Sequence, residues 1–122
     1  MKFSTDKVQG NFIHSYAKGV IQLRDRNLTN HTIISADHII SDWQPATIES
    51  MTVDDFRPAL ELKPEILLFG SGEKQQFPDI GLLTEIMRAG TAIEVMETHA
   101  ACSTFNVLIS ENRSVVAALL VD

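Results

Sequence analysis

From Pro64 to the end of the chain, segments typical of strands alternate with segments typical of helices. Successive strands with a helix between them need a crossover connection, and this makes neighbouring strands parallel. The first of these strands is a continuous apolar run, as expected where both faces of a strand are covered. We therefore expect a βαβαβ unit, whose elements in order are strand 65–69, helix 79–89, strand 92–96, helix 98–110 and strand 113–120.

Both predicted helices carry residues that commonly mark helix ends. Asp79 follows Pro78 in the position of an N-cap, and Gly90 is expected to stop the first helix. Thr98 is the expected N-cap of the second helix, and Asn112 its expected left-handed terminator. Helical spacing predicts that the core-facing residues are Ile80, Leu83, Ile86 and Met87 in the first helix and Ala101, Cys102, Phe105, Leu108 and Ile109 in the second.

Residues 1–42 show a different pattern, in which polar and apolar residues alternate between short turn signals. This alternation is typical of half-buried antiparallel strands. Further on, Thr52 is expected to cap a helix over residues 52–62, which Pro58 should kink or shorten. The strands expected before that helix cover residues 12–16, 20–23, 32–35 and 38–41.

The size of the chain fits one domain, because 122 residues lie within the usual range for a single core. No internal repeat or linker interrupts the pattern. The expected fold class is therefore α/β, as a single three-layer domain over residues 1–122. Its N-terminal antiparallel strands are followed by a Rossmann-like parallel βαβαβ part.

Charge and the termini narrow the possible partners and location. The chain has 10 Lys and Arg residues against 16 Asp and Glu residues, a formal net charge of −6, which disfavours nucleic acid and anionic membrane surfaces. The longest apolar run, residues 115–121, is far shorter than the roughly 20 residues that cross a bilayer, so no membrane insertion is expected. The unpaired Cys102 and the lack of a secretory signal indicate a cytoplasmic protein.

The segment from Gly70 to Pro78 is the clearest candidate for a functional loop. It follows a predicted parallel strand, where open α/β sheets bind ligands, and it exceeds the usual 2 to 6 residues of such loops. Dinucleotide and P-loop motifs are excluded, because Gln75 replaces the third glycine and Lys74 lacks the P-loop neighbours. A structural glycine turn remains the alternative. The candidate ligand-binding residues are Gly70, Ser71 and Gly72, with Thr104 and Asn106 on the following helix.

Other reactive residue types give weaker signals, and no catalytic residue, metal site or cofactor is predicted. Cys102 is placed near the start of a helix, whose dipole would lower the pKa of its thiol, with His99 three residues before it. The same residue lies on the apolar stripe, so a core role is the competing interpretation. Asn106 is expected either to fix a neighbouring loop or to contact a ligand. The remaining histidines are scattered without ligand spacing.

Several short motifs follow one another in a fixed order along the second half of the chain. They are Ile66-Leu67-Leu68-Phe69-Gly70-Ser71-Gly72, Gln76-Phe77-Pro78, Glu94-Val95-Met96, Ala100-Ala101-Cys102, Thr104-Phe105-Asn106-Val107-Leu108 and Val116-Ala117-Ala118-Leu119, with Gly90, Glu111 and Arg113. Together they resemble a family of small bacterial and archaeal domains of unknown function, which also includes a mitochondrial respiratory complex I assembly factor and an adipogenesis-associated domain protein. The matching region covers residues 64–121, and the N-terminal part matches more loosely.

The resemblance implies a three-layer α/β domain without an accepted enzymatic activity or cofactor. The sequence departs from the family pattern at His99, Phe105 and Thr91, where Gly, Tyr and an aliphatic residue are common. The first functional hypothesis is therefore a non-catalytic accessory protein that acts through protein contacts, with the partner and oligomeric state open. The alternative is a small-ligand or nucleotide-binding protein that uses the loop Gly70-Ser71-Gly72, and a thiol enzyme is a third option.

Overall fold

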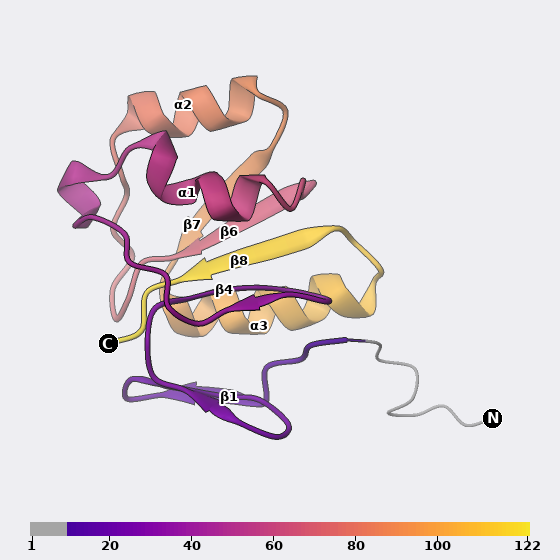
Figure 1. Ribbon diagram of the computed structural model, residues 1–122. Coiled ribbons are helices and arrows are strands. Elements are labelled where there is room, and N and C mark those ends of the chain that lie inside the picture. Colours follow the sequence, from indigo (N-terminus) through magenta and orange to yellow (C-terminus); the bar gives the residue numbers. More distant parts are fainter. Residues whose placement is uncertain (1–9) are drawn as a thin grey trace.

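The computed structural model describes residues 10–122, which form two β-sheets and three α-helices (Figure 1). A small antiparallel sheet contains β1 (Ser15–Ala17), β2 (Val20–Gln22) and β3 (Asn27–Leu28). The main sheet and its helices follow in the order β4 (Thr32–Ser35), β5 (Ile39–Ile40), α1 (Val53–Leu60), β6 (Ile66–Gly70), α2 (Ile80–Arg88), β7 (Ala92–Met96), α3 (Thr98–Ser110) and β8 (Val115–Leu119).

The main sheet has the strand order β5-β4-β8-β6-β7. Strand β6 pairs in parallel with both β7 and β8, so Gly70 at its end lies between Met96 and Leu119. Strand β8, the last in sequence, also pairs antiparallel with β4. The expected α/β fold class, with antiparallel strands followed by a parallel βαβαβ part, is confirmed.

The two crossover helices lie on opposite faces of this sheet. Connections between parallel strands are almost always right-handed. The step from β6 to β7 moves one way along the sheet, and the step from β7 to β8 returns past β6, so the helices that make these steps must cover different faces. Figure 1 shows α1 and α2 on one side and α3 on the other, which gives the three layers.

The core beneath α1 and α2 is built on three aromatic residues. The ring centroid of Phe56 lies 5.9 Å from that of Trp43 and 5.3 Å from that of Phe69. The indole Nε1 of Trp43 donates to the carbonyl oxygen of Asp55 at 2.8 Å, so the buried polar atom has a partner. Burial of each large apolar side chain stabilises the fold by about 1.5–3 kcal/mol.

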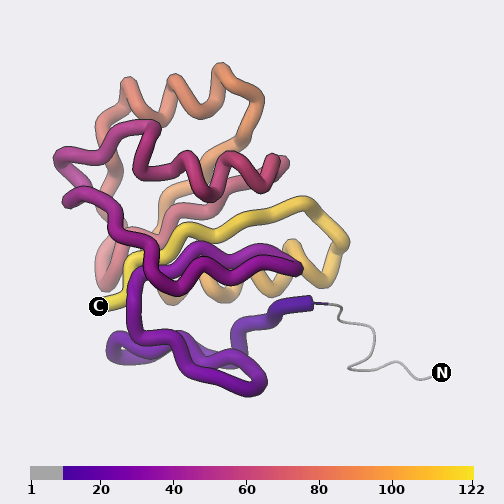
Figure 2. The backbone as a smooth tube through the Cα atoms, viewed as in Figure 1, coloured from indigo at the N-terminus to yellow at the C-terminus, as the bar shows by residue number. Residues whose placement is uncertain are grey.

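On the opposite face, α3 lies between the main sheet and the small sheet, and Figure 2 shows the N-terminal hairpin beside it. Cys102 and Phe105 of α3 pack with Ile21 and Leu28 of the small sheet. The hairpin turns through Lys18 and Gly19, with φ values of 49° and 79°. Positive φ at both central residues is the geometry that suits a two-residue hairpin turn.

The N-terminal strands differ in extent from the prediction. The strand expected at 12–16 is β1, three residues long and shifted toward the hairpin turn. No strand was expected at β3, where Asn27 and Leu28 pair with β2 after the chain reverses. The predicted helix 52–62 is α1, capped by Thr52 as expected but ending at Leu60, two residues after Pro58. Such short strands have little periodicity, so their bounds depend on pairing partners.

The buried side of α2 also differs from the prediction. The bounds and the Asp79 cap are as expected, but Ile80 and Met87 are 71% and 49% exposed rather than buried. Leu82, which was not expected in the core, is buried with Leu83 and Ile86. The sequence shows that α2 is apolar on most of its circumference, and only the position of the sheet beneath it selects the buried side.

Helix α3 has the predicted bounds, yet its first residue has another role than expected. Glu97 is the N-cap, and Thr98 is the first helical residue with no exposed surface. Leu108, expected in the core, is only partly buried, whereas the other four residues of the predicted stripe are buried. The predicted terminators are confirmed, because Gly90 and Asn112 have φ values of 106° and 60°.

Candidate functional site

The loop after β6 lies where the two crossovers diverge. The neighbouring strands β6 and β7 lead to α2 and α3 on opposite faces of the sheet, so their carboxyl ends form a topological switch point, the place where open α/β sheets usually bind ligands. The loop from Gly70 leaves β6 there, and the segment after Leu119 leaves β8 beside it. The amide of Leu120 donates to the carbonyl oxygen of Gly70 at 2.9 Å and joins the two segments.

Thr98 fixes the glycine turn to the start of α3. The amide of Gly72 donates to Thr98 Oγ1 at 2.8 Å, and the amide of Thr98 donates back to the carbonyl oxygen of Gly72 at 2.9 Å. The same hydroxyl donates to the carbonyl oxygen of Leu120 at 2.7 Å. A side chain at Gly70 would place its Cβ 3.0 Å from the Cα of Thr98, so this position requires glycine for close approach.

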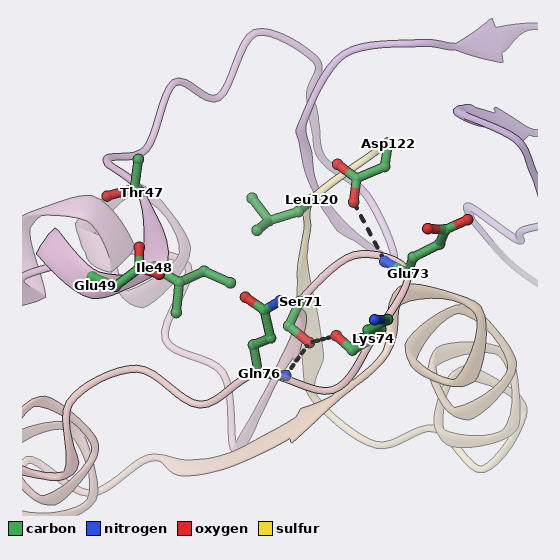
Figure 3. A pocket seen from close by; sticks show the side chains of 9 residues that line it. All are labelled: Thr47, Ile48, Glu49, Ser71, Glu73, Lys74, Gln76, Leu120 and Asp122. Atoms are coloured by element: carbon green, nitrogen blue, oxygen red, sulfur yellow. Dashed lines mark hydrogen bonds between the residues drawn. The ribbon is translucent and has the colours of Figure 1, made fainter.

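Ser71 holds the loop together from inside. Its side chain is buried, and its hydroxyl donates to the carbonyl oxygen of Lys74 at 2.6 Å while accepting from the amide of Gln76 at 2.9 Å. The amide of Ser71 donates to the carbonyl oxygen of Met96 at 2.9 Å. The candidate ligand-binding hydroxyl is therefore already occupied by backbone partners within the loop (Figure 3).

Asp122 places a carboxylate over the glycine turn. Its Oδ2 accepts from the amide of Glu73 at 3.3 Å, and it lies so close to Gly72 that a Cβ there would collide with it. Gly72 has a φ of 102°, which is the conformation that leaves this space open. The amide of Asp122 donates to the hydroxyl of Tyr16 at 3.2 Å. An internal anion thus occupies the position in which backbone amides of such a loop would meet an anionic ligand.

A cavity of about 450 Å³ lies between this loop and the 3-10 helix η2 (Ile48–Ser50). Figure 3 shows Thr47, Ile48 and Glu49 across from the residues of the loop and of the chain end. Its charged lining residues are the acids Glu49, Glu73 and Asp122 and the base Lys74, which makes it unfavourable for phosphates. The full lining is Thr47, Ile48, Glu49, Ser71, Glu73, Lys74, Gln76, Leu120 and Asp122.

Thr104 and Asn106 lie away from this cavity. They are six and eight residues along α3 from Thr98, a distance of roughly 9–12 Å at the rise of an α-helix. Asn106 Oδ1 accepts from the amide of Ile13 at 2.9 Å, and its Nδ2 donates to the carbonyl oxygen of Ile13 at 2.6 Å. The structure therefore brings Gly70, Ser71 and Gly72 together, and it does not join Thr104 or Asn106 to them.

Cys102 lines a separate cavity of about 180 Å³ with His14, His99, Tyr16 and Asn106 among its neighbours. Its side chain is buried, and burial raises the pKa of the thiol to about 12. Desolvation of the thiolate causes this rise, and its direction is opposite to the lowering expected from the helix dipole. The burial and the raised pKa of Cys102 agree with the core interpretation and disfavour an activated nucleophile.

Two other kinds of site are absent from the described part of the chain. Among residues 10–122, no group of three or more His, Cys, Asp or Glu side chains is arranged to hold a metal ion. Over the same residues, none of the helices combines the length and the apolar character that a bilayer crossing requires.

Sequence reasoning missed three features of this region. The position of Asp122 over Gly72 depends on the path of the chain after β8, which no local pattern encodes. The double role of the Thr98 hydroxyl was hidden behind its resemblance to an N-cap. The exposed residues Ile80 and Met87 of α2 were assigned to the core, although the apolar residues of this segment exceed one helical face, a signal that the sequence already contained.

Comparisons with known proteins find a matching family model, relatives in sequence and solved structures with the same fold. A family model described as "Protein of unknown function (DUF498/DUF598)" matches residues 13–120. The "13 kDa major membrane protein" of Francisella tularensis is 31% identical over 98% of this chain and 99% of its own length. A crystal structure of a protein from Bordetella parapertussis superposes with a TM-score of 0.85 at 28% identity, and covers 93% of this chain and 98% of that chain.

A further group of relatives carries a functional name. The zebrafish (Danio rerio) protein named NADH dehydrogenase [ubiquinone] 1 alpha subcomplex assembly factor 3 is 30% identical over 91% of this chain. The match covers 64% of the length of that relative. Homologues of this chain therefore include assembly factors, and one homologue is named as a membrane protein.

Proposed function

The chain belongs to the DUF498/DUF598 family of proteins of unknown function, and on that basis we propose that it is a non-catalytic accessory protein of the cytoplasm that acts, as a single domain, through contacts with other proteins. The names of the assembly-factor relatives support this class of function. The occupied amides and hydroxyl of the glycine loop, together with the neutral thiol of Cys102, favour a binding role over catalysis.

The observation that carries this proposal is an apolar surface beside α2. Phe77, Ile80 and Met87 are 60%, 71% and 49% exposed, and we call these three residues the α2 flank. Ile80 and Met87 are seven residues apart and share one side of α2, and Phe77 precedes the helix; exposed apolar side chains grouped in this way commonly mark protein contacts. Val107, the other large exposed hydrophobic residue of the described chain, lies on α3, which covers the opposite face of the main sheet.

Affinity capture with a matched pair of variants tests the proposal. The full chain with an affinity tag is compared with the double variant Ile80→Glu and Met87→Glu, which adds two charges to the α2 flank. The control is Val107→Glu, an equally exposed position away from the flank. We expect the double variant to lose partners that the wild-type chain and the control retain. Equal recovery of all partners by the three chains would contradict the proposal.

A second function is favoured by the cavity between the loop after β6 and η2. Its volume of about 450 Å³ lies within the roughly 300–1,000 Å³ typical of small-molecule sites. A ligand at 100 times its Kd would stabilise the fold by about 2.7 kcal/mol, which a thermal shift detects. Because three acids line the cavity, we expect no shift with nucleotides or phosphorylated metabolites. A thermal shift with one of these compounds that is lost in the Gly72→Val variant would contradict this expectation and would support the ligand-binding function.

A further inference from the structure

Strand β7 forms one edge of the main sheet. The amide of Ala92 donates to Glu65 and the carbonyl oxygen of Met96 accepts from Ser71, so the even-numbered residues of β7 direct their backbone groups toward β6. Successive residues of a strand point their backbone groups to opposite sides. The backbone groups of Ile93 and Val95 therefore face away from the sheet.

This outward row lacks most of its hydrogen-bond partners. The carbonyl oxygen of Val95 accepts from Nε2 of Gln75 at 3.1 Å. No partner within residues 10–122 is recorded for the amide of Val95 or for either backbone group of Ile93. An open row of this kind is a template on which another strand can pair.

The α2 flank lies on the same side as this open edge. The hydrogen bond and charge of Asp54 are the main causes that raise the pKa of Arg57 in α1, and the charge of Glu85 adds to them, which places Glu85 on the side of α2 near α1. Ile80 and Met87 lie about 140° and 160° around the helix from Glu85 at 100° per residue. They therefore point away from α1. Because α1 contacts β8 and α2 contacts β7, the direction away from α1 leads past the free edge of β7.

The two faces of the edge differ in chemistry. Ile93 and Val95 direct their side chains toward the core beneath α2, where they are partly buried. Glu94 points to the opposite face and is exposed, and the exposed Glu97 follows the end of the strand. A strand added beside β7 would therefore meet apolar side chains on one face and carboxylates on the other.

We propose that the free edge of β7 binds an extended segment of a partner protein as a further strand of the sheet. The segment alternates apolar side chains, which pack on the α2 flank, with Lys or Arg side chains, which face Glu94. This inference rests on the proposed protein-contact function and names the chemistry of the partner. Main-chain hydrogen bonds to Ile93 and Val95 supply affinity, and the alternation supplies specificity.

A second copy of the chain is a poorer occupant of this edge. An antiparallel β7 pair centred on Glu94 would place two like charges directly opposite each other, which is destabilising. Each copy also carries a net charge of −6, so approach of two copies is opposed at long range. A basic segment from another protein meets neither obstacle.

Selection from random seven-residue peptides displayed on phage, with the full chain as bait, tests the inference. We expect recovered peptides to alternate apolar residues with Lys or Arg. In NMR hydrogen exchange, the best synthetic peptide should slow exchange of the Ile93 and Val95 amides at least tenfold. Failure to recover a binder, binders without alternation, or slowed exchange only elsewhere would overturn the inference. If protection of these amides rises with protein concentration in the absence of peptide, the occupant of the edge is a second copy of the chain and the inference is overturned.

Charge reversal gives a variant that leaves the core untouched. Glu94→Lys should weaken binding of the basic peptide at least tenfold and favour a peptide with Glu at the Lys positions. Glu85→Lys makes the same charge change on the side of α2 that faces α1 and should leave peptide binding unchanged. Equal effects of the two variants would overturn the pairing opposite Glu94. A further outcome is that the double variant of the α2 flank loses its captured partners while no peptide slows hydrogen exchange of the β7 amides. That pair of results would exclude strand addition and would still support the protein-contact function.

Discussion

Asn106 and Ile13, 93 positions apart in sequence, are joined by two hydrogen bonds between one side-chain amide and one backbone residue. The amide oxygen of Asn106 accepts from the backbone N–H of Ile13, and the amide nitrogen donates to its carbonyl oxygen. Because Ile13 lies two residues before β1 and is buried, this pair attaches the small sheet to α3. Asn106 therefore takes the place that a neighbouring strand would have for Ile13.

Replacement of this amide by an apolar side chain should be costly. Asn106→Leu leaves the N–H and the carbonyl oxygen of Ile13 without these partners, and each loss costs about 1–3 kcal/mol where water cannot replace the bond. We expect a destabilisation of about 2–4 kcal/mol in urea unfolding. Ser103→Ala, an exposed position on the same helix, should change stability by less than about 0.5 kcal/mol. A loss equal to that of the control would show that Asn106 is dispensable.

Thr98→Val tests the hydroxyl that joins the glycine turn to the chain after β8. The substitution keeps the shape of the side chain but removes the partner of the Gly72 amide and of the Leu120 carbonyl oxygen. The expected destabilisation is about 2–4 kcal/mol, measured by thermal or urea unfolding. Thr104→Val on the same helix is the control, since no side-chain hydrogen bond of Thr104 is recorded within the described residues. Similar losses for the two variants would contradict this role of Thr98.

Ser71→Ala should loosen the loop without disturbing β6. The variant removes the acceptor of the Gln76 amide and the donor to the Lys74 carbonyl oxygen. We expect faster hydrogen exchange at the Gln76 amide and a loss of stability of about 1–2 kcal/mol, while the Leu68 amide of β6 stays protected. Glu73→Gln, at an exposed position of the same loop, serves as the control. Unchanged exchange at Gln76 would show that another group orders the loop.

The thiol of Cys102 should resist alkylation in the folded protein. Its pKa is raised to about 12, so at pH 8 the thiolate fraction is roughly 1,000-fold or more below that of an exposed cysteine with a pKa of about 8.5. Mass spectrometry should find iodoacetamide labelling only after denaturation, and rapid labelling of the native chain would contradict the core assignment. Because the unfolded chain loses this proton first, the contribution to stability is complete below about pH 8.5 and declines as the pH rises toward 12.

The parts of the fold that sequence analysis predicted correctly are those with local signals. Gly90 and Asn112 end their helices in the left-handed conformation because few other residues adopt it. The prediction of the buried side of α2 was wrong at Ile80 and Met87. A helix that is apolar on both flanks can bury either one, and its position on the sheet determines which flank is buried. The candidate loop was identified through its glycines, but the carboxylate of Asp122 above it depends on tertiary structure alone.

The place of β8 between β4 and β6 governs the order in which the molecule can form. Thr32 of β4 has its partner at Leu119, so the antiparallel half of the main sheet cannot join the parallel half until residues 115–119 have left the ribosome. Contacts between residues so distant in sequence slow folding. During synthesis, one side of β4 and one side of β6 lack hydrogen-bonding partners, and β8 supplies the partners of both strands in a single step. The nascent chain is thus most vulnerable to mispairing just before β8 emerges.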